Sequence, residues 1–134
     1  MDESKYLAKE FFTYTGDLTS LAAGASNADQ VNIEADSDFL INKVTFSCYD
    51  AANGALVANP NITVQITDGA SGRNLFDTAQ NIGNIAGTAQ LPGVWPVAKL
   101  LRAKSTLTVT FANRSAAAYY NIELSFLGTK LYLR

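Results

Sequence analysis

The stretch "ITVQITDGASGRNLF" (residues 62–76) joins an alternating strand pattern to a glycine-rich turn. The isoleucine and valine side chains of its first half share one face of an extended chain, because neighbouring side chains of a strand point to opposite sides. The closing "NLF" is again strand-like. We therefore expect a β-hairpin in which Asp68 caps the turn, while Gly69 and Gly72 adopt positive φ values that other residues avoid.

The spacing within this loop, Asp68 to Arg73, tests two alternative functions. A phosphate-binding P-loop requires Gly-x4-Gly-Lys-Ser/Thr before a helix, but these glycines are closer together and Arg73 stands where lysine is required. A nucleophile elbow requires Gly-x-Ser-x-Gly and a basic partner, but "GASGR" places Ser71 directly before a glycine and the chain contains no histidine. The spacing therefore favours a turn over a phosphate-binding or catalytic loop.

Two further stretches alternate in the same way: "TLTVTFAN" (residues 106–113) and "YNIELSFLG" (residues 120–128). The longer stretch "FLINKVTFSCY" (residues 39–49) changes its apolar phase near Asn42, which indicates a bulge. Together with shorter candidates near the start and the middle of the chain, the pattern predicts about seven or eight strands. We expect an all-β protein, an antiparallel β-sandwich with the topology of an eight-stranded jelly roll.

Length and charge bound the organisation of the chain. Its 134 residues suffice for one domain, and the charged start lacks an apolar pattern. We therefore expect an N-terminal arm at residues 1–10 and a single β-sandwich domain at residues 11–134. A net charge of −2 without a basic tract argues against nucleic acid as a partner. Since the start also lacks the apolar core of a signal peptide and no stretch approaches the ~20 apolar residues of a spanning helix, we expect cytoplasmic synthesis and no membrane partner.

The chain is poor in the side chains that carry most chemistry. The lack of histidine removes the commonest general base and a principal zinc ligand. Cys48 is the only cysteine, so no intrachain disulfide is possible. It lies in the apolar run "VTFSCYD", which favours a small buried side chain over a reactive thiol. We therefore expect no enzyme activity, no catalytic residue, no metal and no cofactor.

Three carboxylates, Glu34, Asp36 and Asp38, stand at alternate positions. In an extended strand this spacing places them on one face, where they could bind calcium or act as a general acid and base. The surrounding "EADSDF" also fits a solvated turn that leads into the next strand. We favour the solvated turn and keep metal binding and acid–base catalysis as alternatives.

Aromatic residues are the remaining candidates for a site. Trp95 is bracketed by Pro92 and Pro96, so we expect it in a loop, and Tyr119 follows the small-residue run "SAAA". Exposed aromatic side chains on a sandwich could stack on sugar rings. Such a tryptophan more often closes the end of the core or anchors an oligomer interface. We favour these two roles over sugar binding.

Three features of the chain carry a family resemblance: a strand–Asp–turn–Gly-Arg hairpin, a proline-led stretch before a Thr-rich strand, and an "F-x-N-x-S" strand end followed by a closing "F-L-G-x-K-L-Y" strand. They occur at Ile66, Asp68, Gly72 and Arg73, at Pro96, Lys99 and Leu100, and at Phe111, Asn113, Ser115 and residues 126–132. With these features the chain, over about residues 10–134, resembles the jelly-roll cement (decoration) proteins on the outside of tailed-bacteriophage capsids.

The resemblance implies a structural virion protein that binds the outer capsid surface and stabilises contacts between major capsid subunits. It would be made in the cytoplasm of a bacterial host and reside on the capsid exterior. Because a single copy would bind weakly, we expect a homo-oligomer, a dimer or trimer. The candidate interface residues are Trp95, Tyr119, Arg73, Thr106, Thr108 and Thr110. The alternative is a carbohydrate-binding or adaptor β-sandwich of a phage tail or capsid exterior used in host adhesion, which requires Trp95 and the tyrosines on one exposed face.

Overall fold

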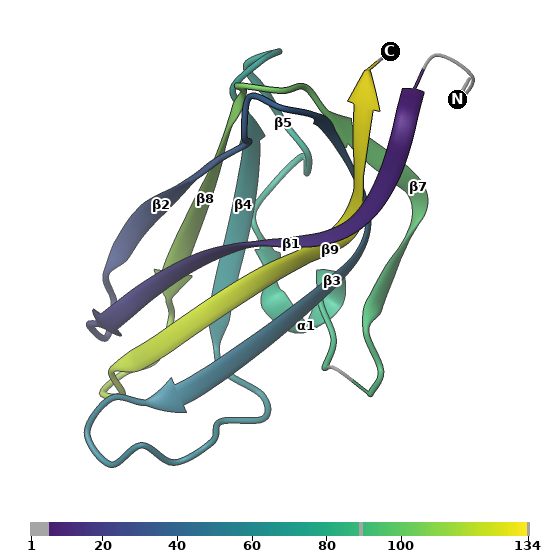
Figure 1. Cartoon of the computed structure of the whole chain (residues 1–134). Helices are drawn as coiled ribbons and strands as arrows, with labels where there is room; N and C mark the ends of the chain where they lie inside the picture. Colours follow the sequence, from purple (N-terminus) through teal and green to yellow (C-terminus); the bar gives the residue numbers. More distant parts are fainter. Residues whose placement is uncertain (1–5, 89, 134) are drawn as a thin grey trace.

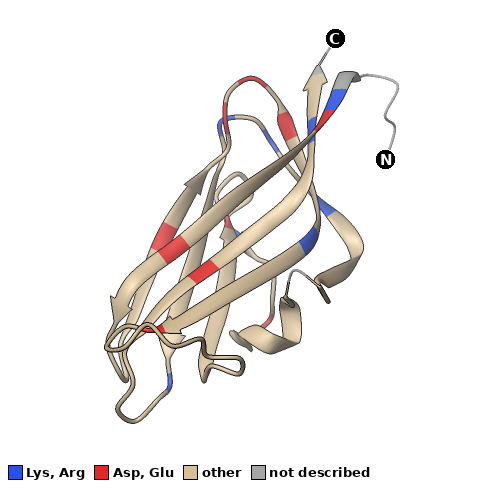
Figure 2. Ribbon diagram, turned by 60° about the horizontal axis from the view of Figure 1, so that its bottom comes forward, with Lys and Arg blue, Asp and Glu red and all other residues tan. Residues whose placement is uncertain are grey.

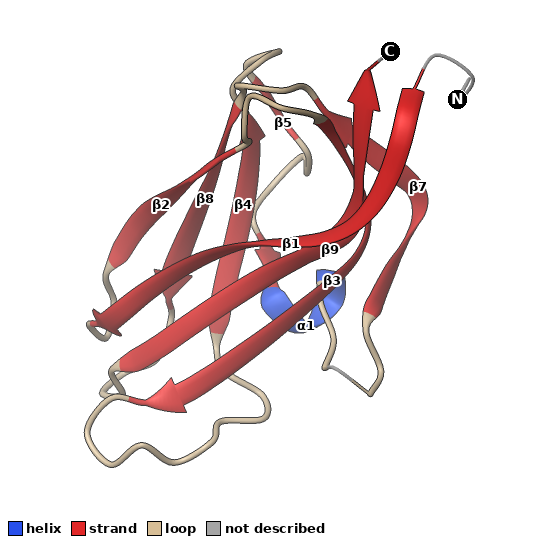
Figure 3. Cartoon of the chain, viewed as in Figure 1, coloured by secondary structure: helices blue, strands red, loops and turns tan. Residues whose placement is uncertain are grey.

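The structure, a computed structural model, describes residues 6–88 and 90–133 as a β-sandwich with one short helix (Figures 1 and 3). The strands are β1 (Tyr6–Leu21), β2 (Ser26–Asn32), β3 (Asp38–Asp50), β4 (Ile62–Asp68), β5 (Arg73–Asn74), β6 (Gln80–Asn81), β7 (Gly93–Leu101), β8 (Thr106–Asn113) and β9 (Tyr120–Leu133), and α1 spans Ile82–Ile85. Among the residues described, no helix is long and apolar enough to cross a membrane.

The strand order is that of a jelly roll. One sheet has the order β1-β9-β3-β7, and the other has the order β2-β8-β4-β5, with β6 also paired to β4. Both β5 and β6 are antiparallel to β4, at Asp68↔Arg73 and Thr63↔Asn81, so they are two pieces of one interrupted strand. Counted in this way the described residues form eight strands in two sheets of four, and the predicted all-β class is confirmed.

The core has the phase that the alternating stretches predict. The inward-facing apolar side chains within residues 62–66 of β4, 107–111 of β8 and 122–126 of β9 are at most 1% exposed. They are Ile62, Val64 and Ile66, then Leu107, Val109 and Phe111, and finally Ile122, Leu124 and Phe126. Each side chain of this size contributes roughly 1.5–3 kcal/mol when it leaves water, so this pattern decides which face of each strand turns inward.

The bulge predicted near Asn42 is present. The register of β3 shifts between Ile41 and Lys43 against both of its neighbours, β9 and β7. Gly128 of β9 lies opposite this bulge, where a Cβ atom would overlap the carbonyl oxygen of Leu40. Glycine therefore lets β9 run close to the bulged strand, and β9 continues to Leu133.

The hairpin predicted for residues 68–73 is also present, with one difference. Asp68 Oδ1 accepts a hydrogen bond from Ala70 N at 3.0 Å, and Gly72 has a φ of 70°. The expectation of positive φ at Gly69 was wrong. Glycine is required there because a Cβ atom would overlap the carbonyl oxygen of Thr106, which accepts a hydrogen bond from Gly69 N at 2.8 Å.

The strand β1 extends into the region predicted to be an arm. From Tyr6 onward its backbone pairs with β9, beginning with Tyr6↔Leu133. Part of the segment predicted as an arm at residues 1–10 is therefore a strand of the sandwich. The first five residues lie outside the part of the chain that the structure describes.

Cys48 is a core residue, as expected from its apolar surroundings, with none of its surface exposed. Burial raises the pKa of its thiol to about 11, and the negative charge of Asp50 acts in the same direction. The thiolate that reacts and binds metals is therefore strongly disfavoured at neutral pH.

Candidate functional site

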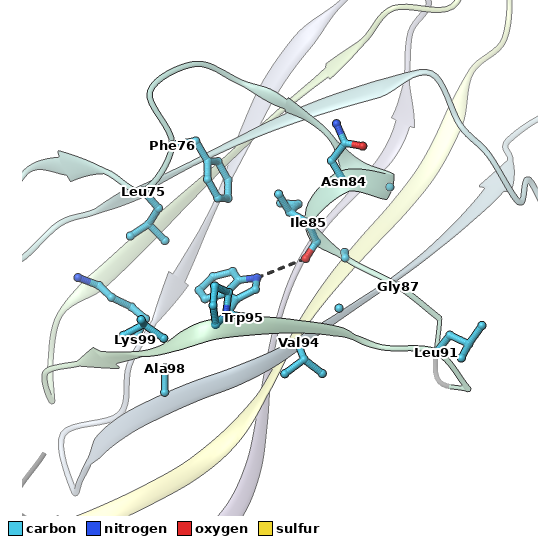
Figure 4. A pocket seen from close by; sticks show the side chains of 15 residues that line it. Leu75, Phe76, Asn84, Ile85, Gly87, Leu91, Val94, Trp95, Ala98 and Lys99 are labelled. Carbon is cyan, nitrogen blue, oxygen red and sulfur yellow. Dashed lines mark hydrogen bonds between the residues drawn. The ribbon is translucent and has the colours of Figure 1, made fainter.

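An apolar groove of about 740 Å³ lies between β7 and the chain around α1. Figure 4 shows the Trp95 ring pointing from β7 toward Phe76 and Ile85, while Val94 points away from them. The indole Nε1 donates a hydrogen bond to the carbonyl oxygen of Ile85 at 3.3 Å. Lys99 closes one end, and Leu75 lies beside Phe76 on the wall.

The groove exists because the two sheets pack against each other differently along the two edges of the sandwich. On one side β1 contacts β2, and Asp17 N donates a hydrogen bond to Asp29 Oδ2 at 2.9 Å. On the other side the strands at the sheet edges are β7 and the interrupted pair β5 and β6. The gap left by the interruption is covered by α1 and by the segment containing Phe76, which Gln65 Nε2 holds through a 3.0 Å hydrogen bond to the Phe76 carbonyl oxygen.

Trp95 lies in the strand β7, so its predicted loop position was wrong. The pairing of β7 with β3 jumps from Val94↔Lys43 to Lys99↔Ile41, so the intervening residues have no partner on β3. The missing N–H of Pro96 therefore removes no ladder hydrogen bond, and proline is tolerated in this edge strand. The flanking prolines indicated irregular backbone, but the irregularity is a bulge within a strand.

The rim of the groove is apolar and exposed. Leu91 is 80% exposed, Val97 is 79% exposed and Val94, on the outer side of the same strand, is 64% exposed. Single exposed apolar residues are common on proteins, but a cluster beside an apolar groove is typical of a protein-binding surface. Neither Leu91 nor Val97 was predicted as a site residue, although their position in the uncharged run "LPGVWPVA" was a usable signal.

The three threonines predicted as interface residues lie together. Thr106, Thr108 and Thr110 point to the outer face of β8, since Leu107 and Val109 between them are buried. The strand β8 lies between β2 and β4, so this face is the outer surface of one whole sheet. The other predicted interface residues, Trp95, Tyr119 and Arg73, lie elsewhere.

Tyr119 lies in the loop between β8 and β9, away from the groove that holds Trp95. It is 51% exposed, and its carbonyl oxygen accepts a hydrogen bond from Ala51 N at 2.9 Å. Tyr49 and Leu56, which form an isolated antiparallel bridge, are exposed at the same end of the sandwich. Because Trp95 is half-buried between β7 and α1, these residues do not form the single exposed aromatic face that a sugar-binding surface requires.

Arg73 lies at the first position of β5 and is exposed. It pairs with Asp68, whereas its neighbour Asn74 pairs with Thr67 and accepts a hydrogen bond from the Thr67 hydroxyl at 2.8 Å. Neighbouring residues of a strand point to opposite sides. Arg73 is therefore separate from the face that carries Thr67 and Thr108.

The carboxylates predicted as a possible metal or acid–base site surround a lysine. Lys130 Nζ lies 2.9 Å from Glu34 Oε2 and 3.3 Å from both carboxylate oxygens of Asp36, and 4.2 Å from the centre of the Phe12 ring. Burial alone would lower the pKa of Lys130, but the hydrogen bonds to the two carboxylates outweigh this effect and raise its pKa above the usual range. The ammonium group occupies the position where a cation would bind.

Asp38 turns to a different partner. Its Oδ1 accepts a hydrogen bond from Ala103 N at 2.9 Å, and its Oδ2 lies 3.6 Å from Arg102. Within residues 6–88 and 90–133 no cluster of three potential metal ligands occurs. Residues 34–37 are therefore an ion-paired turn between β2 and β3, whereas Asp38 begins β3 and is only 3% exposed. The favoured interpretation of a solvated turn is correct for Glu34 and Asp36 and wrong for Asp38.

Comparisons with known proteins support the fold assignment. The structure matches a chain of the cyanophage Pam1 capsid asymmetric unit with a TM-score of 0.51 and 14% identity, over 94% of this chain and 87% of that chain. It matches VP2 of an infectious bursal disease virus subviral particle with a TM-score of 0.42 and 13% identity. That match covers 95% of this chain but only 34% of the VP2 chain. It matches the CBM22-1 xylan-binding domain of Paenibacillus barcinonensis Xyn10C with a TM-score of 0.28 and 14% identity. That match covers 95% of this chain and 97% of the xylan-binding domain.

The last two scores are too low to bear on the fold. No family model matches the chain, and neither does any curated protein. At 14% identity the first match speaks for shared architecture and not for shared residues. The chain has the jelly-roll fold of a chain found in a bacteriophage capsid, over nearly the full length of both.

Proposed function

We propose that this chain is a non-enzymatic structural protein of a virus particle, a cement protein that binds the outer surface of an assembled capsid. It stabilises contacts between neighbouring major capsid subunits. It is made in the cytoplasm of a bacterial host and resides on the exterior of the virion.

The observation that carries the proposal is the agreement in fold with a chain of the Pam1 capsid asymmetric unit. The match covers 94% of this chain and 87% of the other, so the two chains are similar in length as well as in architecture. A domain of this size and topology is therefore known as a component of a phage capsid. The resemblance noted in the sequence points to the same class of protein.

The apolar groove supports the same function. Its rim residues Leu91 and Val97 are largely exposed, and its floor is formed by the Trp95 ring. Large aromatic residues in the centre of a desolvated patch often dominate the binding energy of an interface. We assign the groove as the contact with the capsid, and we retain Tyr119 and Arg73 as candidate peripheral contacts.

The mechanism follows from mass action. A protein that binds the assembled lattice but not free subunits lowers the free energy of the lattice and so opposes its disassembly. Many copies on one particle, each weakly bound, together give a large stabilisation. This mechanism needs contact surfaces and no reactive group.

The test uses capsids of the virus that encodes the chain, prepared without it. Val97→Asp places a charge on the exposed rim of the groove, and Thr13→Asp makes the same charge change at an exposed position of β1. Burial of a valine side chain is worth roughly 1.5–3 kcal/mol, so Val97→Asp should weaken capsid binding about tenfold or more.

Co-sedimentation with the capsids measures binding, and the temperature at which capsids release their contents measures stabilisation. We expect the unmodified chain and Thr13→Asp to bind and to raise that temperature, and Val97→Asp to do neither at the same concentration. If the unmodified chain neither co-sediments with capsids nor stabilises them, the proposed function is wrong. If Val97→Asp binds as well as Thr13→Asp, the capsid contact lies outside the groove.

A further inference from the structure

Among the described residues, the outer face of the sheet β2-β8-β4-β5 carries no charged side chain. Its members follow from the register, because directly paired residues share a face. They are Ser26, Ala28, Gln30 and Asn32 of β2, Thr106, Thr108, Thr110 and Ala112 of β8, Thr63, Gln65 and Thr67 of β4, Asn74 of β5 and Asn81 of β6. We call this surface the uncharged face.

The acidic residues of β2 and β4 turn away from this face. Asp29 accepts the hydrogen bond from Asp17 N of the opposite sheet, and Asp68, whose side chain is 8% exposed, pairs with Lys99 at 3.1 Å. The outer face of the other sheet is different. There Asp17 of β1 lies directly opposite Glu123 of β9, and both are exposed. Figure 2 shows acidic positions in red on the long strands of the sandwich.

A large surface without charge is a property of contacts rather than of free surfaces. A soluble surface is best served by about 25–35% charged residues, whereas the centres of interfaces are depleted in charged residues. The uncharged face is also suited to contact a copy of itself. Thr63, whose hydroxyl is buried, and Gln65, whose amide is bonded to the Phe76 backbone, are exceptions on this face. The other threonine, serine, asparagine and glutamine side chains each carry both a donor and an acceptor, so one such surface can hydrogen-bond to an identical one.

Symmetry adds a second reason. In a twofold dimer each residue near the axis meets its own copy, so a charged residue there meets a like charge. The uncharged face avoids this repulsion, and the Asp17–Glu123 face would not. We propose that two copies of this chain pair through their uncharged faces, about a twofold axis that passes close to Thr108 in β8, between β2 and β4.

The dimensions of the face predict the strength of the pairing. Strands lie ~4.8 Å apart and rise ~3.3 Å per residue, so four strands of the length of β4, seven residues, span roughly 19 by 23 Å. The accessible surface exceeds this projected area because side chains make it rough, but the interface stays near the small end for specific dimers. We therefore expect a dimer that dissociates on dilution to about micromolar concentration.

Sedimentation equilibrium of the whole chain tests the pairing without any capsid. At concentrations well above micromolar, the unmodified chain should have twice the 14.3 kDa mass of the monomer. Thr108→Lys brings two like charges together at the axis and should weaken the dimer at least about tenfold. The matched control, Thr13→Lys, makes the same change on the outer face of the other sheet and should leave the dimer intact.

Two further measurements separate self-pairing from damage to the fold. Thr108→Glu should also be monomeric, and an equimolar mixture of Thr108→Lys and Thr108→Glu should restore dimers of mixed composition. About 1 M salt, which shortens the screening length to ~3 Å, should strengthen the Thr108→Lys dimer. A monomeric unmodified chain, a Thr108→Lys variant that stays dimeric, or a mixture that stays monomeric would each overturn the pairing. None of these results depends on capsid binding.

Discussion

The ion-paired turn around Lys130 allows a test of which partner is costly to remove. The Lys130 side chain is 5% exposed, whereas those of Glu34 and Asp36 are each 51% exposed. We compare Lys130→Met, which removes the positive charge and retains most of the apolar stem, with the double variant Glu34→Gln and Asp36→Asn. The two changes break the same contacts from opposite sides.

The burial of the three groups predicts unequal costs. After Lys130→Met the carboxylates can return to water, so the loss is the value of half-exposed ion pairs and of the contact with the Phe12 ring, about 1–2 kcal/mol. After the double change a buried ammonium group has lost both anionic partners, which costs about 3 kcal/mol. We therefore expect the double variant to be the less stable one by about 1–2 kcal/mol.

Urea unfolding followed by the fluorescence of Trp95 measures both free energies of unfolding. Adding Lys130→Met to the double variant should recover part of its lost stability, because it removes the unpaired buried charge. The reasoning is refuted if Lys130→Met destabilises at least as much as the double variant, or if the triple variant is no more stable than the double. The m-value, the slope of the unfolding free energy against urea concentration, should be the same for all variants if each unfolds from the same native state.

Alkaline unfolding gives a second readout of the same contact. Because pairing raises the folded-state pKa of Lys130 above its ordinary value of about 10.4, the associated stability is complete below that pH. It is lost as the pH rises through the raised pKa. Stability of the unmodified chain should therefore fall more steeply in this range than that of Lys130→Met, whereas parallel curves would contradict this assignment.

Two further predictions concern buried polar groups. Asn113 is 1% exposed, and its Nδ2 donates hydrogen bonds to the carbonyl oxygens of Leu21 at 2.9 Å and Ala118 at 2.8 Å, so Asn113→Ala should cost about 2–4 kcal/mol of unfolding free energy in a urea titration. A loss below about 0.5 kcal/mol would mean that these carbonyls find other partners. Cys48, with its pKa raised to about 11 by burial and by Asp50, should react with a thiol reagent at neutral pH only as fast as the chain opens. Rapid labelling under native conditions would show that the core near Cys48 opens readily.

Much of the fold can be predicted from the sequence because the alternation of β4, β8 and β9 is a local signal. Each of these strands has one apolar and one polar face in the sequence itself, and burying the apolar face decides its orientation. The same holds for the hairpin at Asp68 and for the bulge at Asn42, where turn residues and a change of phase are visible without any neighbours. The lack of histidine likewise excludes the histidine-dependent catalytic sites whatever the fold, because composition does not depend on how the strands pair.

Other features were decided by neighbours that are distant in sequence. Gly69 is needed because of the carbonyl oxygen of Thr106, and the carboxylate of Asp36 is held by Lys130, 94 residues away. The groove around Trp95 depends on an edge strand that leaves its partner and on an interruption in the facing sheet. The alternation of apolar and polar residues along a strand indicates which side chains turn inward. Only the pairing of strands decides which outward side chains become neighbours, and thereby where the groove and the uncharged face lie.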